Sequence, residues 1–99
     1  MSQPIYKLFL VKSSAAGYQL SEKERETLFA KVEEAFTKVG GKRILLCNSA
    51  WASEQWSNWG VEQFPDMEAL QKYTELLNEF NWFQYVESMT ILGTEVPSA

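Results

Sequence analysis

Aromatic and amide side chains that could bind or orient a ligand gather in the middle of this 99-residue sequence. The ten residues from Trp51 to Gly60 contain three of the four tryptophans. Two asparagines lie in the strands predicted around this stretch, where asparagine is depleted. A buried amide needs hydrogen-bond partners, so each asparagine could bind a ligand or only a backbone carbonyl. The candidate pocket residues are Tyr6, Asn48, Trp51, Trp56, Asn58 and Trp59.

The spacing of the tryptophans limits what they can do together. Trp56 and Trp59 are three residues apart in a predicted strand, so they point to opposite faces and cannot line one wall. Trp51 and Trp56 flank the polar turn "ASEQ" and could pair across it. Two interpretations stay open: packing of the hairpin and core, or lining of a pocket by at least one indole.

Two acidic residues, Glu62 and Glu87, interrupt predicted strands. A carboxylate in a partly apolar site can have a raised pKa and act as a general base, which would suit an isomerase. The competing interpretation is a cross-strand ion pair with Lys7 or Lys12, or an acid at the rim of a dimer. Both glutamates are therefore candidate acid or base residues.

The composition excludes several kinds of catalytic site. The chain has no histidine and one cysteine, which excludes serine–histidine triads, histidine-bound haem, thiolate clusters and most catalytic zinc sites. No DxD-type cluster is available for magnesium. We therefore predict no metal and no cofactor. Cys47, with apolar neighbours, is expected to be a small buried hydrophobic residue.

Charge and hydropathy limit the partners. A net charge of −4 with scattered lysines and arginines disfavours nucleic-acid binding. No apolar run is long enough for a membrane span. The start, "MSQPIYKLFLVKSS", resembles a strand more than a signal peptide, so we expect a cytoplasmic protein that binds neither nucleic acid nor membrane.

Local patterns predict six elements in one domain, residues 1–99. Ser21 and Glu24 form a capping-box signature, and the glycine pair after Val39 ends that helix. Asp66 is the expected cap of the second helix. The predicted strands are 5–12, 43–51, 56–64 and 86–92, and the predicted helices are 21–39 and 67–80. This order predicts an α+β, ferredoxin-like βαββαβ sandwich, in which a four-stranded antiparallel sheet carries two helices on one face.

The strands are apolar on both of their faces, although the helices can cover only one. Segments such as Ile5–Lys12, "IYKLFLVK", place apolar residues at adjacent positions. The uncovered face would leave a large apolar patch in water. We therefore predict a homodimer in which the two bare faces pack together about a two-fold axis.

The element order, the length, the segment "VEQFPDMEALQKYTELL" and the ending "ILGTE" resemble the dimeric α/β-barrel superfamily. This family includes stress-responsive barrels, haem-handling enzymes, muconolactone isomerase-like proteins and monooxygenases similar to those of antibiotic biosynthesis. The resemblance implies a barrel of two sheets and a pocket between the sheet and the helices of each subunit. Such monooxygenases use asparagine, tryptophan and tyrosine or arginine to bind a substrate enolate. The matching residue types here are Tyr6, Arg43, Asn48, Asn58 and Trp59.

Three functions follow as alternatives, and whether the protein is an enzyme stays open. The first is an uncharacterised barrel that binds a small apolar or aromatic molecule. The second is a cofactor-independent monooxygenase or isomerase acting on an aromatic or polyketide-like substrate. The third is a protein-interaction module without a pocket. A cavity of at least about 300 Å³ lined by tryptophan and asparagine would separate the first two from the third.

Overall fold

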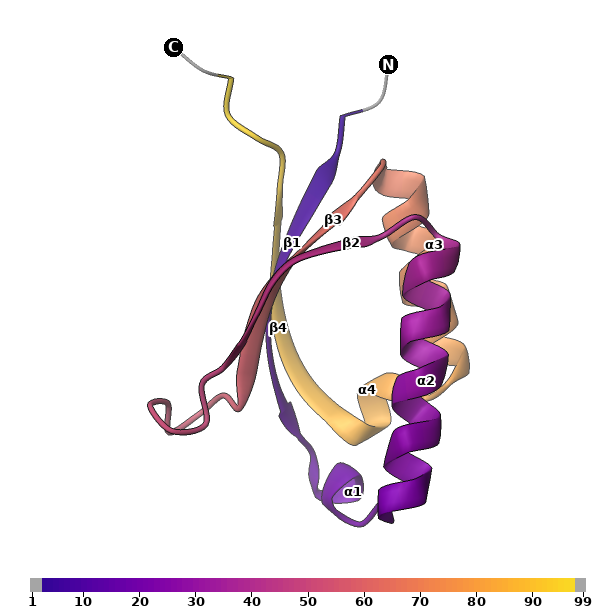
Figure 1. Cartoon of the computed structure of the whole chain (residues 1–99), viewed down its shortest axis with the longest axis vertical. Coiled ribbons are helices and arrows are strands. Elements are labelled where there is room, and N and C mark those ends of the chain that lie inside the picture. The colour runs from indigo at the N-terminus through magenta and orange to yellow at the C-terminus, as the bar shows by residue number, and fades with distance from the viewer. Residues whose placement is uncertain (1–2, 98–99) are drawn as a thin grey trace.

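The computed structural model describes residues 3–97 and has the predicted ferredoxin-like architecture. One antiparallel sheet, with strand order β2-β3-β1-β4, forms one layer, and the long helices form the other (Figure 1). The elements are β1 (Ile5–Ser13), α1 (Ala15–Tyr18), α2 (Glu22–Lys38), β2 (Lys42–Asn48), β3 (Asn58–Phe64), α3 (Met67–Glu79), α4 (Trp82–Tyr85) and β4 (Val86–Gly93). The predicted fold class is therefore confirmed within these residues, and the ends of the predicted 1–99 domain lie outside them.

Both long helices begin at the caps that the sequence predicts. The Ser21 hydroxyl accepts a hydrogen bond from the backbone N–H of Glu24 at 3.1 Å, and the Glu24 carboxylate accepts one from the N–H of Ser21 at 2.9 Å. The Asp66 carboxylate accepts from the N–H of Ala69 at 2.8 Å. Gly40, at φ 81°, ends α2 in the left-handed conformation that glycine adopts without strain.

The two middle strands are shorter than predicted, and residues 49–57 form a loop. The Ser49 hydroxyl donates to the Trp56 carbonyl at 3.0 Å, and the Ser53 hydroxyl accepts from the Trp56 N–H at 3.0 Å. These side-chain bonds satisfy backbone groups that a longer hairpin would have paired. The loop projects from the side of the sheet opposite the helices (Figure 1). Trp51, on this loop, is 84% exposed, so the predicted pairing with Trp56 across a tight turn is wrong.

Two short helices replace connections that were predicted to lack regular structure. Ser14 caps α1, and its hydroxyl also donates to the carbonyl of Gln84 in α4 at 2.7 Å. The Ser14 N–H donates to the Tyr85 carbonyl at 3.0 Å. A Cβ at Gly17 would overlap that same carbonyl, so glycine allows α1 and α4 to pack closely. These contacts join the end of β1 to the start of β4.

The core fills only one end of the space between sheet and helices. Three aromatic rings, from Phe36, Phe64 and Tyr73, lie with their centroids 5.3–5.6 Å apart. Phe64 is fully buried at the end of β3, and Leu77 of α3 packs in the same cluster. Aromatic contacts at these separations stabilise a core beyond the area they bury. The opposite end, where β1 and α1 meet, is not filled by a cluster of this kind, and a hollow remains there.

The outer face of the sheet is apolar and uncovered in the single chain. Leu10 faces Trp59 on one neighbouring strand and Met89 on the other. Met89 is 56% exposed and Ile91 is 59% exposed. The predicted sheet with two apolar faces and helices on only one is thus what the structure has.

Candidate ligand cavity

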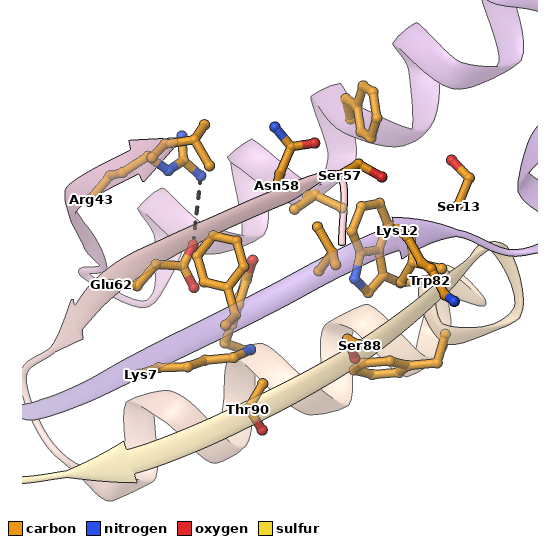
Figure 2. Close-up of a pocket in the computed structure, with 18 of the residues that line it drawn as sticks. Lys7, Lys12, Ser13, Arg43, Ser57, Asn58, Glu62, Trp82, Ser88 and Thr90 are labelled. Carbon is orange, nitrogen blue, oxygen red and sulfur yellow. Dashed lines mark ion pairs between the residues drawn. The ribbon is translucent and has the colours of Figure 1, made fainter. Parts of the chain in front are cut away.

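A cavity of about 450 Å³ lies between the sheet and the helices, at the end that the core leaves open. It is lined by inward side chains of all four strands and by residues of α2, α3 and α4, many of them shown in Figure 2. Its volume is within the range of small-molecule sites. The cavity is therefore large enough for a small organic ligand.

Strand alternation decides which residues reach the cavity. On β1, Lys7, Phe9 and Val11 point to the helices. Asn58 and Glu62 do the same on β3. Polar and charged side chains therefore enter a space that hydrophobic residues would fill in an ordinary core.

A β-bulge in β2 brings a charged residue to the same cavity. Arg43 pairs with Glu62, and Leu46 pairs with Gly60, but the register shifts between them, so that Ile44 is an extra residue. Residues three apart on a regular strand face opposite sides. The bulge removes that difference, and both Arg43 and Leu46 line the cavity.

The long walls of the cavity are apolar. Phe29 of α2 and Trp82 of α4 meet edge to face, with ring centroids 5.9 Å apart. Opposite them, Phe9 lies over Gly60, where an added Cβ would come within 2.8 Å of the Phe9 ring. Val11 and Val32 complete these walls. Such a surface favours a flat, apolar ligand.

One end of the cavity is charged; we call Lys7, Glu33, Arg43 and Glu62 the ionic cluster. The Arg43 guanidinium lies 2.7 Å from the Glu33 carboxylate. It lies 3.6 Å from the carboxylate of Glu62, the ion pair drawn as a dashed line in Figure 2. Lys7 is opposite Glu62 in the β1–β3 register, and its ammonium lies 5.4 Å from the centre of the Tyr73 ring. Glu62 is only 4% exposed. The cluster contains two cations and two carboxylates, so its formal charge is balanced.

Burial shifts the protonation of this cluster. It raises the pKa of Glu62, although Lys7 and Arg43 act in the opposite direction. Burial also lowers the pKa of Lys7, against the effect of Glu62. The pKa of the Tyr73 phenol is raised, mainly by burial and then by Glu62. Loss of hydration therefore outweighs attraction for both Glu62 and Lys7, which eases proton exchange with a bound group.

The other end of the cavity has neutral polar groups and one cation. Ser13, Ser57, Asn58 and Ser88 line it together with Lys12. The Asn58 amide donates to the Cys47 carbonyl at 3.3 Å, so a backbone group already satisfies part of it. Figure 2 shows these residues at the end away from Arg43 and Glu62.

The structure brings together only some of the residues that the sequence singled out. Asn58 and Glu62 line the cavity. Tyr6 and Trp59 occupy strand positions that face the outer side of the sheet, away from the cavity. Asn48 ends β2, where its side-chain oxygen accepts from the Ala50 N–H at 3.0 Å.

The remaining candidates lie at the loop and at the sheet margin. Trp51 is exposed, and its indole N–H donates to the Asn48 carbonyl at 3.0 Å. Trp56 lies beneath the Lys12 ammonium, 5.7 Å from the ring centre. Glu87 forms a cross-strand ion pair with Lys12 at 4.0 Å, as one interpretation of the sequence predicted.

Sequence reasoning did not select Lys7, Phe29 or Trp82 as site residues. A signal for Lys7 was present, because it interrupts the apolar strand "IYKLFLV" on the face that helices cover. Trp82 and Phe29 lie 53 residues apart on different helices, and only tertiary contacts bring them together. Among residues 3–97, no group of three or more histidine, cysteine or acidic residues could hold a metal ion. Within this range no helix combines the length and apolar character needed to cross a membrane.

No family model matches this sequence, and no curated protein gives a significant match. Solved structures do match. A protein of unknown function from Rhodopseudomonas palustris is 17% identical with a TM-score of 0.67, over 99% of this chain and 86% of that one. A mutant chlorite dismutase from Candidatus Nitrospira defluvii is 19% identical with a TM-score of 0.75, over 98% of this chain. SnoaB, a cofactor-independent oxygenase from Streptomyces nogalater, is 14% identical with a TM-score of 0.57, over 98% of this chain and 97% of that one.

These similarities confirm the predicted resemblance at the level of the fold. This chain spans 42% of the chlorite dismutase chain, and it has nearly the same extent as the oxygenase. The fold therefore occurs in an oxygenase, in a dismutase and in a protein without known activity. Function has to be argued from the cavity, because one fold supports many chemistries.

The burial of Glu62 gives a testable pH dependence. Because its pKa is raised in the folded protein, Glu62 keeps its proton at pH values where the unfolded chain has released it. The folded state then binds more protons, so stability falls as pH rises from the ordinary value of 4.5 to the raised folded pKa. One such group changes the free energy of unfolding by at most about 1.4 kcal/mol per pH unit. We expect Glu62→Gln to flatten this slope in urea unfolding across the window.

Glu87→Gln is the matched control, because the Glu87 side chain is 61% exposed. It should keep the wild-type slope. Equal slopes for wild type and both variants would show that Glu62 ionises as freely in the folded protein as in the unfolded chain.

Proposed function

We propose that this protein is a homodimer that binds a flat, mainly apolar small molecule, with an aromatic ring system that carries a hydroxyl or carbonyl group. The observation that carries the proposal is an apolar cavity that ends in a buried carboxylate between two cations. The aromatic walls favour the ring system, and Glu62 and Lys7 favour a polar substituent at the inner end.

The balanced charge of the ionic cluster favours a neutral substituent there. A hydroxyl can donate to the Glu62 carboxylate and accept from the Lys7 ammonium, and a carbonyl can accept from Lys7 alone. A charged group would leave one member of the cluster uncompensated, which is costly in a buried site. Phenols, naphthols and their keto tautomers are therefore the ligand class that we expect at this end.

The cavity also favours binding over the third alternative, an interaction module without a pocket. Its volume of about 450 Å³ exceeds the threshold set from the sequence, and both Trp82 and Asn58 line it. A protein that only presented its surface to a partner would have no need for a buried charge cluster facing an internal space. The cavity therefore supports the first two functions.

Filling the cavity should prevent binding. Thr90 of β4 lines the cavity, and Thr94 lies beyond the strand and is exposed. We expect titration calorimetry to show that naphthol binds wild type and Thr94→Phe with the same affinity. Its affinity for Thr90→Phe should be at least about tenfold lower, because the new ring occupies ligand space. Equal affinities of the two variants, with circular dichroism showing both folded, would place naphthol elsewhere.

The homodimer is proposed from the outer face of the sheet. Leu45, Met89 and Ile91 are each roughly half exposed on that face. An apolar sheet face of this extent in water favours association, and a two-fold axis lets one face complement itself. Charged residues lie at its margin, as Lys12 and Glu87 do, which agrees with the polar rim of many interfaces.

A charge on the apolar part of this face should separate the subunits. Light scattering should give about twice the chain mass of 11.4 kDa for wild type and the chain mass for Ile91→Lys. The reason is that a lysine brought into an apolar interface loses its hydration without gaining a partner of opposite charge. Val96→Lys, at an exposed position outside the sheet, should stay dimeric. A monomeric wild type at micromolar concentration would refute the dimer.

A second candidate function, cofactor-independent oxygenation or isomerisation, is favoured by the buried Glu62. Burial raises the pKa of this carboxyl, which strengthens it as a base once it is ionised. It could remove a proton from an enol or an activated CH₂ group, and Lys7 could stabilise the resulting enolate. With an anthrone-type substrate, one oxygen atom of dioxygen would then become the carbonyl oxygen at the former CH₂ group, and the other would leave as water with the two hydrogens of that group. SnoaB shares the fold and is a cofactor-independent oxygenase.

Oxygen consumption would distinguish catalysis from binding alone. If this function holds, anthrone-type and quinol-type substrates should be oxidised by wild type, and Glu62→Gln should slow the reaction at least about a hundredfold, because a general base is lost. Asn58→Ala should also reduce the rate, since its amide lines the substrate space. An electrode that records no uptake across a varied panel, with ligands that nevertheless bind, would leave binding as the function.

A further inference from the structure

The cavity adjoins a second hollow on the other side of the sheet end. This hollow, the outer groove, has a volume of about 530 Å³ and runs between α1 and loop 49–57. Tyr18 and Trp56 form part of its wall. Three residues, Lys12, Ser13 and Ser57, line both the cavity and the groove. The end of β1 is therefore where the cavity opens towards the groove.

Lys12 is the charged residue at this opening. Its partner Glu87 is 4.0 Å away and 61% exposed, a weak pair by distance and solvation. Glu87 and Glu54 line the groove, but neither lines the cavity. Lys12 therefore has its carboxylate partner on the groove side, and no carboxylate lines the cavity at this end.

The two ends of the cavity differ in charge for this reason. The ionic cluster at the inner end contains two cations and two carboxylates. At the outer end Lys12 lines the cavity together with Ser13 and Ser57, and its carboxylate partner Glu87 lies in the groove. Figure 2 shows Lys12, Ser13 and Ser57 at one end, with Arg43 and Glu62 at the other. A hydroxyl group can donate to an anion that a lysine attracts, so this set of donors suits a single negative charge.

We propose that Lys12, with Ser13 and Ser57, forms a carboxylate subsite at the mouth of the cavity, and that the natural ligand is an aromatic hydroxy or keto acid. This inference rests on the proposed function, which concerns the ring system and its neutral oxygen group. One lysine balances one carboxylate, whereas a doubly charged phosphate would remain partly uncompensated.

The length of the cavity agrees with a ligand that has polar groups at both ends. Lys7 and Lys12 are five residues apart on β1, a separation of roughly 17 Å along an extended strand. Both side chains line the space between these positions. A ligand of two fused rings with an oxygen group at one end and a carboxylate at the other is shorter than this separation along the strand, and the long lysine side chains can reach towards it from both ends.

A hydroxynaphthoic acid and its methyl ester test the subsite, because they differ only in the charge of one substituent. In titration calorimetry at low ionic strength, wild type should bind the acid about tenfold more tightly than the ester, since a hydrogen-bonded charge pair contributes on that order. Lys12→Gln should remove this preference, because it weakens binding of the acid much more than binding of the ester. Lys42→Gln changes the net charge equally but lies outside the cavity lining, and it should keep the preference.

Glu87→Gln supplies a readout that a structural role of Lys12 would not give. Without its competing carboxylate, Lys12 should bind the acid more tightly than in wild type, while the ester is unaffected. Equal binding of acid and ester by wild type would overturn the carboxylate subsite and leave the proposed function standing. Equal weakening of both ligands by Lys12→Gln would do the same. Binding of neither ligand to wild type would overturn the proposed function and the subsite together.

Discussion

The sheet has two faces, and its helices cover only one; this constraint governs the rest of the structure. Strand alternation sends Lys7, Phe9 and Val11 towards the helices, and sends Leu8 and Leu10 to the uncovered side. The covered side holds both the core and the cavity. The uncovered side gives the apolar surface from which a dimer is proposed. One β1 sequence therefore contributes to both surfaces, residue by residue.

The cavity exists because large side chains pack against one another at only one end of the covered side. Phe36, Phe64 and Tyr73 fill that end. At the other end, small residues such as Ser13 and Ser88 take inward strand positions, and the aromatic side chains form walls around an open space. Between the two lies Glu62, whose burial is unfavourable unless cations compensate it. Arg43 reaches it because of the bulge in β2. The arrangement is thus more easily explained by a ligand than by stability.

The sequence predicted what depends on local interactions and missed what depends on register. The caps at Ser21 and Asp66 and the helical periodicities are local, and those elements formed as expected. The two ends of loop 49–57, residues 49–51 and 56–57, were assigned to strands because serine side chains that bond to the backbone leave no periodic signal. Of the candidate site residues, Asn58 and Glu62 reach the cavity, but the partners of Glu62 depend on pairing across strands. The tryptophans of the segment 51–60 lie on the loop and on the outer face of the sheet. The tryptophan that lines the cavity is Trp82, which is distant from them in sequence.

Because of the bulge at Ile44, insertion or deletion of one residue in β2 would change which side chains line the cavity. Because this one extra residue sets the phase of β2, its deletion would turn Arg43 away from Glu62 or Leu46 away from the ligand space. Ile44 is itself 54% exposed, so its loss would remove little from the core. Gain or loss of a single codon here offers evolution a route to a cavity with a different lining within an unchanged fold.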